Sequence, residues 1–236
     1  MIDHDLLQTT LSRWKLPCDT RQLALYGAYI ALLVEWNQRM NLVADSTLAD
    51  PTRRHLLDSL VLATAVADVP ESLADVGAGA GLPGIPLAIL WPTTAVTLIE
   101  SIGKKADFLR HVAATLPLPN VQIYPERAEI VGRDHTHRER YALVSARAVA
   151  NLATLAELCL PVCRVGGLWL APKGHDVEAE VQDAAPAIQR LGGALNGVYD
   201  VLIPDEPMRS LVVVDKIAST PALYPRAVGV PRKNPL

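Results

Sequence analysis

A glycine-rich loop carries the clearest chemical signal in the sequence. Residues 75–84 read Asp-Val-Gly-Ala-Gly-Ala-Gly-Leu-Pro-Gly and lie between two apolar runs. Glycines at alternate positions let the backbone turn sharply and let a ligand approach the main chain. The free N–H groups at the start of a following helix can then face that ligand. The loop therefore predicts a ligand site at the carboxyl edge of an open α/β sheet.

Two cofactors fit the spacing of these glycines. Gly79, Gly81 and Gly84 satisfy G-x-G-x-x-G, the pattern of dinucleotide-binding loops. Gly77, Gly79 and Gly81 instead form G-x-G-x-G shortly after an aspartate, which suits S-adenosylmethionine. The glycines by themselves leave both cofactors open.

The residues beside the glycines favour S-adenosylmethionine. Asp75 can hold a water molecule or an ammonium group near a methionine moiety. Pro83 and Pro86 lack N–H groups that a pyrophosphate would need. Glu100 ends the next apolar run, where a carboxylate can accept hydrogen bonds from both ribose hydroxyls of either cofactor. We therefore expect a methyl donor.

Strands that alternate with helices must position this loop. The expected strands cover 73–76, 96–99, 121–124, 141–145 and 168–171, and the expected helices cover 86–91, 103–116, 152–163 and 177–191. This alternation predicts a parallel sheet with right-handed crossovers. Residues 196–203 and 210–214 are two further strand-like runs, joined too closely for a crossover helix, so they should pair antiparallel. By analogy of fold, such a terminal hairpin indicates a methyltransferase rather than a dinucleotide-binding protein.

Three regions are expected along the chain. Residues 1–70 show helical spacing, as between Tyr26 and Ile30, and no strand alternation. Residues 71–216 form the methyltransferase domain, and residues 217–236 form a basic, Pro-rich tail. The predicted fold class is α/β, with a Rossmann-like class I methyltransferase sheet that ends in an antiparallel β-hairpin and carries an N-terminal helical lobe.

The composition narrows the classes of function. Half of the 236 residues are hydrophobic, 20% are charged, and the net charge is −3. A disordered chain and a generic basic nucleic-acid binder are therefore excluded, and any polyanion site has to be local. Residues 76–99 carry no charge, but their glycines and prolines argue against a membrane-spanning helix. Three cysteines do not make a disulfide framework, so we expect the protein to be located in a reducing compartment, the cytoplasm.

Other reactive side chains point to structural roles. Cys159 and Cys163 are expected to lie on one helix in the core, and we expect no metal site. His55 and Asp58 are three residues apart on a predicted helix, where pairing or capping is the expected role. Short basic clusters are candidates for contacts with RNA phosphates. They are Arg53-Arg54-His55, Lys104-Lys105, and in the tail Arg226, Arg232 and Lys233. From Lys216 to the end the chain holds four basic and no acidic residues, so we expect phosphate contacts there.

Further sequence motifs lie on both sides of the glycine loop. They are Trp36-Asn37, Asn41-Leu42, His55-Leu56-Leu57-Asp58-Ser59-Leu60, residues 75–89, Gly103-Lys104-Lys105, Phe108-Leu109, Arg127-Ala128-Glu129, Ser145-Ala146-Arg147-Ala148, Gly166-Gly167, Lys173-Gly174, Tyr224-Pro225-Arg226 and residues 231–236. Together they resemble the RsmG family, also called GidB, of bacterial 16S ribosomal RNA guanine-N7 methyltransferases. The resemblance covers the chain from about residue 20 to the end and leaves residues 133–140 unmatched.

The resemblance implies roles for single residues. Gly77 and Leu82 would line the donor site, Ala128 and Glu129 would face the adenine, and Arg147 would lie beside the donor and the incoming base. Arg147 is thus the expected catalytic residue, and Lys173 joins the expected RNA contacts. The expected cofactor-binding residues are Asp75, Gly77, Gly79, Gly81, Leu82, Glu100, Ala128, Glu129 and Arg147.

The expected reaction needs little from the protein beyond positioning. Guanine N7 has an exposed lone pair and no proton, so in-line attack on the methyl group of S-adenosylmethionine requires no general base. The expected product is S-adenosylhomocysteine, and the expected partner is 16S ribosomal RNA or the small ribosomal subunit, bound by a monomer that contacts no membrane. An NAD-dependent oxidoreductase, a methyltransferase of a non-RNA substrate and a non-catalytic donor-binding module remain as alternatives.

Overall fold

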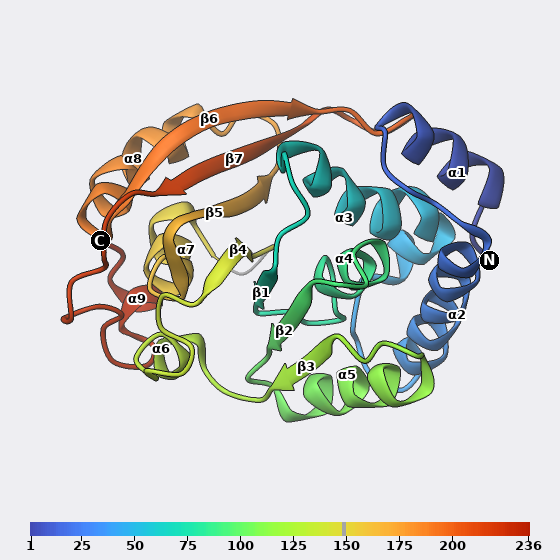
Figure 1. The fold of residues 1–236 in the computed structure, drawn as a ribbon, viewed down its shortest axis with the longest axis horizontal. Helices are drawn as coiled ribbons and strands as arrows, with labels where there is room; N and C mark the ends of the chain where they lie inside the picture. The colour runs from blue at the N-terminus through green and yellow to red at the C-terminus, as the bar shows by residue number, and fades with distance from the viewer. Residues whose placement is uncertain (148–149) are drawn as a thin grey trace.

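A seven-stranded sheet runs through the middle of the molecule in the computed structural model, which describes residues 1–147 and 150–236 (Figure 1). The strand order is β3-β2-β1-β4-β5-β7-β6. The strands are β1 (Ser72–Val76), β2 (Ala95–Ile99), β3 (Val121–Tyr124), β4 (Tyr141–Ser145), β5 (Cys163–Lys173), β6 (Gly193–Val201) and β7 (Arg209–Lys216). Strands β1 to β5 pair in parallel, and β7 pairs antiparallel with both β5 and β6. The predicted Rossmann-like sheet with a terminal hairpin is confirmed.

The sheet changes direction of growth at β1. The chain first adds β2 and β3 on one side of β1, then returns to place β4 on the other side. At such a switch point the loops after neighbouring strands diverge and leave a crevice at the carboxyl ends. The glycine loop follows β1 directly, so it lies at this crevice.

Helices cover both faces of the sheet (Figure 1). They are α1 (His4–Arg13), α2 (Thr20–Asn37), the 3-10 helices η1 (Asp45–Ala49) and η3 (Val61–Ala65), the π-helical η2 (Thr52–Leu57), α3 (Asp58–Leu60), α4 (Gly84–Leu90), α5 (Gly103–Thr115), α6 (Ala128–Val131), α7 (Leu152–Cys159), α8 (Glu178–Arg190) and α9 (Val230–Lys233). One face packs against α1 to α5 and the opposite face against α7 and α8, each over its own apolar cluster.

The helices before residue 70 share their core with the sheet. Leu33 of α2, Leu98 of β2 and Phe108 of α5 are buried in one apolar cluster. Helix α2 begins with a capping box, in which the Asp19 carboxylate accepts from the Gln22 N–H at 2.7 Å and Gln22 Oε1 accepts from the Asp19 N–H at 2.9 Å. Gln22 Nε2 also donates to the carbonyls at the end of α4, which joins α2 to the helix after the glycine loop. The division of the chain at residues 70 and 216 stays a prediction.

The helix predicted over residues 152–163 was wrong at its end. Helix α7 ends at Cys159, and Cys163 begins β5. Pro161 explains the difference, because it has no N–H group with which to continue the helix. Both cysteines are buried as expected, but they lie on different elements.

The expected phosphate contact of Lys216 was also wrong. Lys216 ends β7 and is 1% exposed. Its ammonium donates to the carbonyls of Leu160 and Leu191, at 2.9 and 3.1 Å, and to the Thr220 hydroxyl. Lys216, which we expected to be exposed with the rest of the tail, is therefore buried and connects β7 to the ends of two helices.

No helix within residues 1–147 and 150–236 has the length and apolarity needed to cross a bilayer. The uncharged stretch 76–99 holds the glycine loop, α4 and β2, as predicted.

Candidate active site

The glycine loop has a backbone that its alternate glycines make possible. Gly77, Gly79 and Gly81 have φ values of 73°, 58° and 86°, a region that other residues rarely adopt. The next glycine, Gly84, is needed for space, because a Cβ there would lie 2.3 Å from Leu98 Cδ2. The loop is therefore pressed against β2 while its turns face the crevice.

Asp75 supports the loop from beneath. Its side chain is fully buried, accepts a hydrogen bond from the Gly84 N–H at 2.9 Å, and accepts another from the Ser145 hydroxyl at 3.2 Å. Burial raises the pKa of Asp75 to about 6, against the lowering effect of these hydrogen bonds. The carboxylate thus links the start of α4 to the end of β4.

Glu100 holds the opposite side of the loop. Its carboxylate accepts from the Gly79 N–H at 2.8 Å and from the Ile102 N–H at 2.7 Å. Tyr29, which is buried in α2, donates its hydroxyl to the Ala80 carbonyl at 2.7 Å. The loop is therefore held by contacts from β1, from the end of β2 and from the N-terminal helices together.

A cavity of about 510 Å³ opens over the loop, and we call it the donor cavity after the methyl donor that the sequence predicts there. Its lining includes Gly77, Gly79, Leu82, Glu100 and Arg147. A narrower cavity of about 120 Å³ adjoins it, and we call this the adenine cavity because the family resemblance places the adenine at its lining residues Ala128 and Glu129. Its lining includes Gly77, Ala128, Glu129, Gly229 and Arg232. The two cavities share Gly77, Ser101, Arg127 and Arg232.

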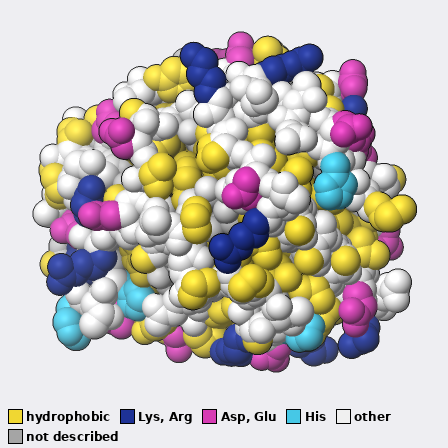
Figure 2. Space-filling view, turned by 45° about the vertical axis from the view of Figure 1, so that its right-hand side comes forward, with side chains coloured by type: hydrophobic (Ala, Val, Ile, Leu, Met, Phe, Trp, Pro, Cys, Tyr) yellow, Lys and Arg dark blue, Asp and Glu magenta, His cyan; other side chains and the backbone are white. Residues whose placement is uncertain are grey.

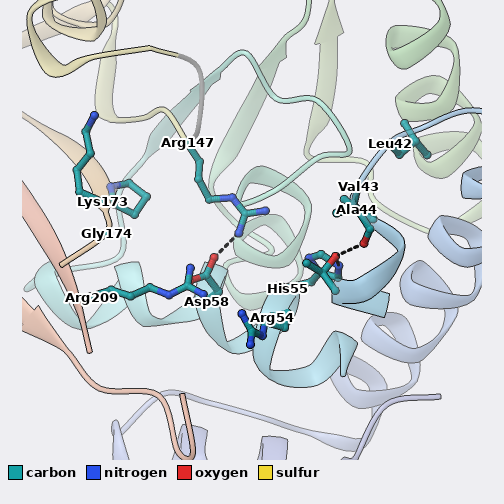
Figure 3. A pocket seen from close by; sticks show the side chains of 12 residues that line it. Leu42, Val43, Ala44, Arg54, His55, Asp58, Arg147, Lys173, Gly174 and Arg209 are labelled. Carbon is teal, nitrogen blue, oxygen red and sulfur yellow. Dashed lines mark hydrogen bonds and ion pairs between the residues drawn. The ribbon is translucent and has the colours of Figure 1, made fainter. Parts of the chain in front are cut away.

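A third cavity of about 520 Å³, the outer cavity, lies on the other side of Arg147 (Figure 3). It shares Leu42, Val43 and Arg147 with the donor cavity, so these side chains form the boundary between the two spaces. The remaining polar lining is mainly basic. It includes Arg54, Lys173 and Arg209, with Asp58 and His55 beneath them.

Asp58 joins two arginines of the outer cavity. One carboxylate oxygen accepts from Arg209 at 2.6 Å, and the other accepts from Arg147. The Asp58 side chain is only 5% exposed, while those of Arg147 and Arg209 are 20% and 30% exposed. Asp58 follows η2 directly, so the helical segment before the sheet orients arginines from β7 and from the end of β4.

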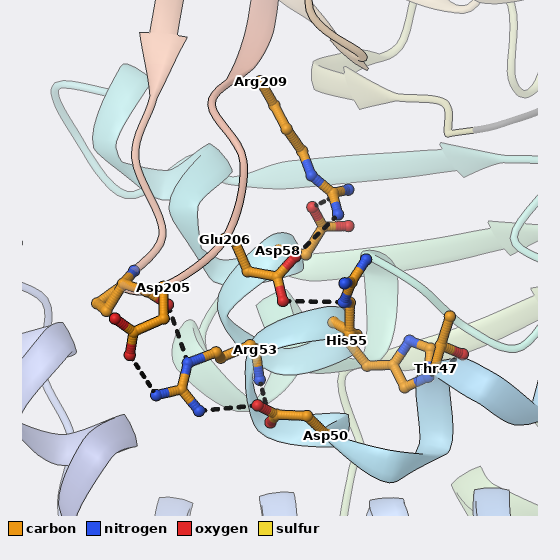
Figure 4. Close-up of polar contacts among 10 residues, drawn as sticks. Thr47, Asp50, Arg53, His55, Asp58, Asp205, Glu206 and Arg209 are labelled. Atoms are coloured by element: carbon orange, nitrogen blue, oxygen red, sulfur yellow. Dashed lines mark hydrogen bonds and ion pairs between the residues drawn. The ribbon is translucent and has the colours of Figure 1, made fainter.

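Glu206 extends this network to the N-terminal side (Figure 4). It lies in the β6–β7 connection, with a side chain 6% exposed, and its carboxylate pairs with Arg54 at 2.8 Å. Its other oxygen lies 3.8 Å from Arg209. The three arginines Arg54, Arg147 and Arg209 are therefore held by two buried carboxylates, which fixes guanidinium groups that would otherwise move freely.

His55 lies beneath the same cavity as a neutral side chain. It is 3% exposed, and its Nε2 lies 3.1 Å from the Thr47 hydroxyl. Burial, followed by the positive charge of Arg147, lowers the pKa of His55 to about 4. His55 therefore adds no charge to the cavity at neutral pH.

The predicted RNA-binding residues fall into different surroundings. Arg54 and Lys173 line the outer cavity, where Lys173 Nζ also pairs with Glu180 at 2.7 Å. Arg53 faces away from it and pairs with Asp50 and Asp205.

In the tail, Arg226 is bound to the fully buried Glu157 at 2.6 Å, Arg232 lines the donor and adenine cavities, and Lys233 is exposed. On the face drawn in Figure 2, Lys and Arg side chains are scattered among acidic and apolar ones.

Sequence reasoning missed Arg209. It follows a turn with no recognisable motif, and only the return of β7 beside β5 brings it to Asp58, 151 positions away. Asp58 was expected to pair or cap next to His55, whereas its partners are the two arginines. In the motif 145–148, Ala148 lies outside the described residues. Among the described residues, no three His, Cys, Asp or Glu side chains come together as a metal site.

The sheet order, the loop after β1 and the acid after β2 define a class I S-adenosylmethionine-dependent methyltransferase. A solved structure with this fold is that of M. jannaschii TYW2 in complex with AdoMet, which matches with a TM-score of 0.55 at 15% identity over 76% of this chain and 80% of that chain.

Residues 22–204 match the family described as rRNA small subunit methyltransferase G. Proteins named Ribosomal RNA small subunit methyltransferase G are similar over nearly the full length. The one from Roseiflexus castenholzii is 51% identical, over 98% of this chain and 99% of that protein. The one from Chloroflexus aggregans is 47% identical, over 98% and 97%. The chain belongs to the rRNA small subunit methyltransferase G family.

Proposed function

We propose that the protein transfers a methyl group from S-adenosylmethionine to N7 of a guanine in 16S ribosomal RNA. The observation that carries this proposal is the meeting of two cavities of similar size at Arg147, Leu42 and Val43. One is formed by the glycine loop and Glu100, and the other is lined by basic side chains. Such an arrangement lets a donor and a charged substrate approach each other from opposite sides of one boundary.

The donor side fits S-adenosylmethionine better than a dinucleotide. The Gly84 N–H, which a G-x-G-x-x-G loop would offer to pyrophosphate, is bonded to Asp75. A second carboxylate, Glu100, lines the cavity, where it would repel phosphates and accept ribose hydroxyls. Asp75 would act by holding the loop. Gly77, Gly79, Gly81 and Leu82 would surround the methionine part, and Ala128 and Glu129 the adenine.

The substrate side fits a nucleotide of a folded RNA. Arg54, Arg147, Lys173 and Arg209 place four positive charges around the outer cavity, where they pair with Glu206, Asp58 and Glu180. The net charge of the whole chain is −3, so a site for a polyanion has to be local. Arginine side chains can bind phosphate oxygens and the O6 edge of guanine through two N–H groups. The target base has to leave its stack to enter. Arg53, Arg226 and Lys233 stay predictions as RNA contacts.

The residues at the boundary position the reacting atoms and move no proton. The bound donor supplies an electrophilic methyl group, whose bond to sulfur breaks as the bond to N7 forms. The N7 lone pair is free at neutral pH, so the neutral His55 and the paired Asp58 are not required as bases. Orientation can contribute about 7–11 kcal/mol to such a two-reactant step. Arg147, fixed by Asp58, would orient the base, and the reaction would take place in the cytoplasm, with the protein as a monomer.

The test uses radiolabelled S-adenosylmethionine with small ribosomal subunits that lack the modification, and with naked 16S ribosomal RNA. We expect label in 7-methylguanosine at one site. Arg147→Ala should lose most of this label, while Arg110→Ala, in an exposed pair with Asp107, should keep it. Label in another nucleoside, or binding of NADH without binding of S-adenosylmethionine, would contradict the proposal.

A further inference from the structure

The tail is bound to the back of the cofactor region. Arg226 pairs with Glu157 of α7, and the Gly229 N–H donates to Glu129 of α6 at 2.8 Å. The Thr154 hydroxyl of α7 donates to the Pro231 carbonyl at 3.0 Å. Figure 1 shows α9 beside α6 and α7, near the C-terminus. Three contacts in six residues hold this segment against the helices that follow β3 and β4.

The same segment forms part of the cavity walls. Gly229, Pro231 and Arg232 line the adenine cavity, and Arg232 also lines the donor cavity. Arg232 therefore lies where the two spaces join. Arg232 and Lys233 are both exposed, but Lys233 lies outside both linings as far as the structure describes them.

We infer that residues 229–232 form a wall of the adenosine site, and that Arg232 contacts the donor instead of serving only as an RNA contact. Glu129 supports the inference, because it lines the adenine cavity and its carboxylate also accepts a hydrogen bond from the Gly229 N–H of the tail. A guanidinium at the junction can donate to adenosine oxygen and nitrogen atoms. The inference rests on the proposed use of S-adenosylmethionine. It adds to the cofactor site a tail segment that lies outside the glycine loop and outside the ends of the strands.

The experiment measures binding of S-adenosylhomocysteine by calorimetry, without RNA. Arg232→Ala should weaken binding about fivefold or more, as expected for loss of a charged hydrogen bond. Lys233→Ala, the neighbouring exposed residue, should stay within about twofold of the parent protein. If Arg232→Ala binds as tightly as the parent while its RNA affinity falls, Arg232 is an RNA contact and the inference is overturned. If the parent protein itself fails to bind S-adenosylhomocysteine, the proposed function fails first.

Limited trypsin digestion of the unaltered protein gives a second readout. Cleavage after Arg232 and Lys233 should slow when S-adenosylhomocysteine is present, because the bound adenosine packs against this segment. Free methionine, which lacks the adenosine, should give no protection. Equal cleavage rates with and without S-adenosylhomocysteine, under conditions where calorimetry shows it bound, would overturn the inference.

Discussion

Asp58→Asn is the substitution that most directly tests how the outer cavity is built. It keeps the volume of the side chain and removes the charge that holds Arg147 and Arg209 together. An amide offers one oxygen in place of two, so at most one guanidinium retains a full acceptor. The other must turn toward solvent or toward Glu206, which already pairs with Arg54.

The size of the effect follows from the exposure of the three side chains. Removing one partner of a fully buried pair costs about 3–5 kcal/mol. Asp58 is nearly buried at 5% exposure, but the guanidiniums at 20% and 30% stay partly hydrated. We therefore expect a loss of about 2 kcal/mol in the free energy of unfolding. Misplacing Arg147 by about 1 Å should lower kcat by about 100-fold.

Urea unfolding and steady-state methyl transfer to small subunits separate the two effects. Asp107→Asn is the matched control, because Asp107 forms an exposed pair with Arg110, 63% and 49% exposed, and should change stability by less than about 0.5 kcal/mol. Affinity for S-adenosylhomocysteine should be unchanged in Asp107→Asn. The reasoning is refuted if Asp58→Asn retains the kcat of the parent protein, or if its activity falls only as much as the fraction of folded protein.

Two further changes test the loop that shapes the donor cavity. Because burial raises the pKa of Asp75 from 3.8 to about 6, its folding contribution is present below pH 3.8 and lost as pH rises through about 6. As the pH rises from 4 to 7, the free energy of unfolding of Asp75→Asn should therefore increase by up to about 3 kcal/mol relative to that of the parent protein. Urea unfolding at a series of pH values measures this difference. Parallel pH profiles of the two proteins would contradict the argument. Gly84→Ala should lose about 1–3 kcal/mol, because the new Cβ meets Leu98 at 2.3 Å. Gly103→Ala, with nothing within 4 Å of its Cβ, is the control, and equal melting temperatures of these two variants would refute the packing argument.

The fold could be predicted because its signals are local. Apolar runs and helical spacing located β1 to β4 and α5 closely, since a strand or helix pattern repeats every two or every three to four residues. Strand β5 begins five residues before the predicted strand 168–171. Errors occurred where one residue overrides a pattern, as Pro161 does between Cys159 and Cys163. Burial could not be predicted for Lys216, because the carbonyls of Leu160 and Leu191 that accept from its ammonium lie at helix ends, 56 and 25 positions away in the sequence.

The glycine loop, the acid that faces it and the family could all be recognised from the amino-acid sequence, because backbone with positive φ selects glycine and so leaves a regular pattern of glycines. The partners of the charged residues, in contrast, follow from the folded structure. It brought Arg209 to Asp58 across 151 positions, bound Arg226 to Glu157, and placed Arg232 on a cavity wall. Charge carries no information on which partner it will meet, since ion pairs form between chain segments that the packing of the sheet and helices brings together.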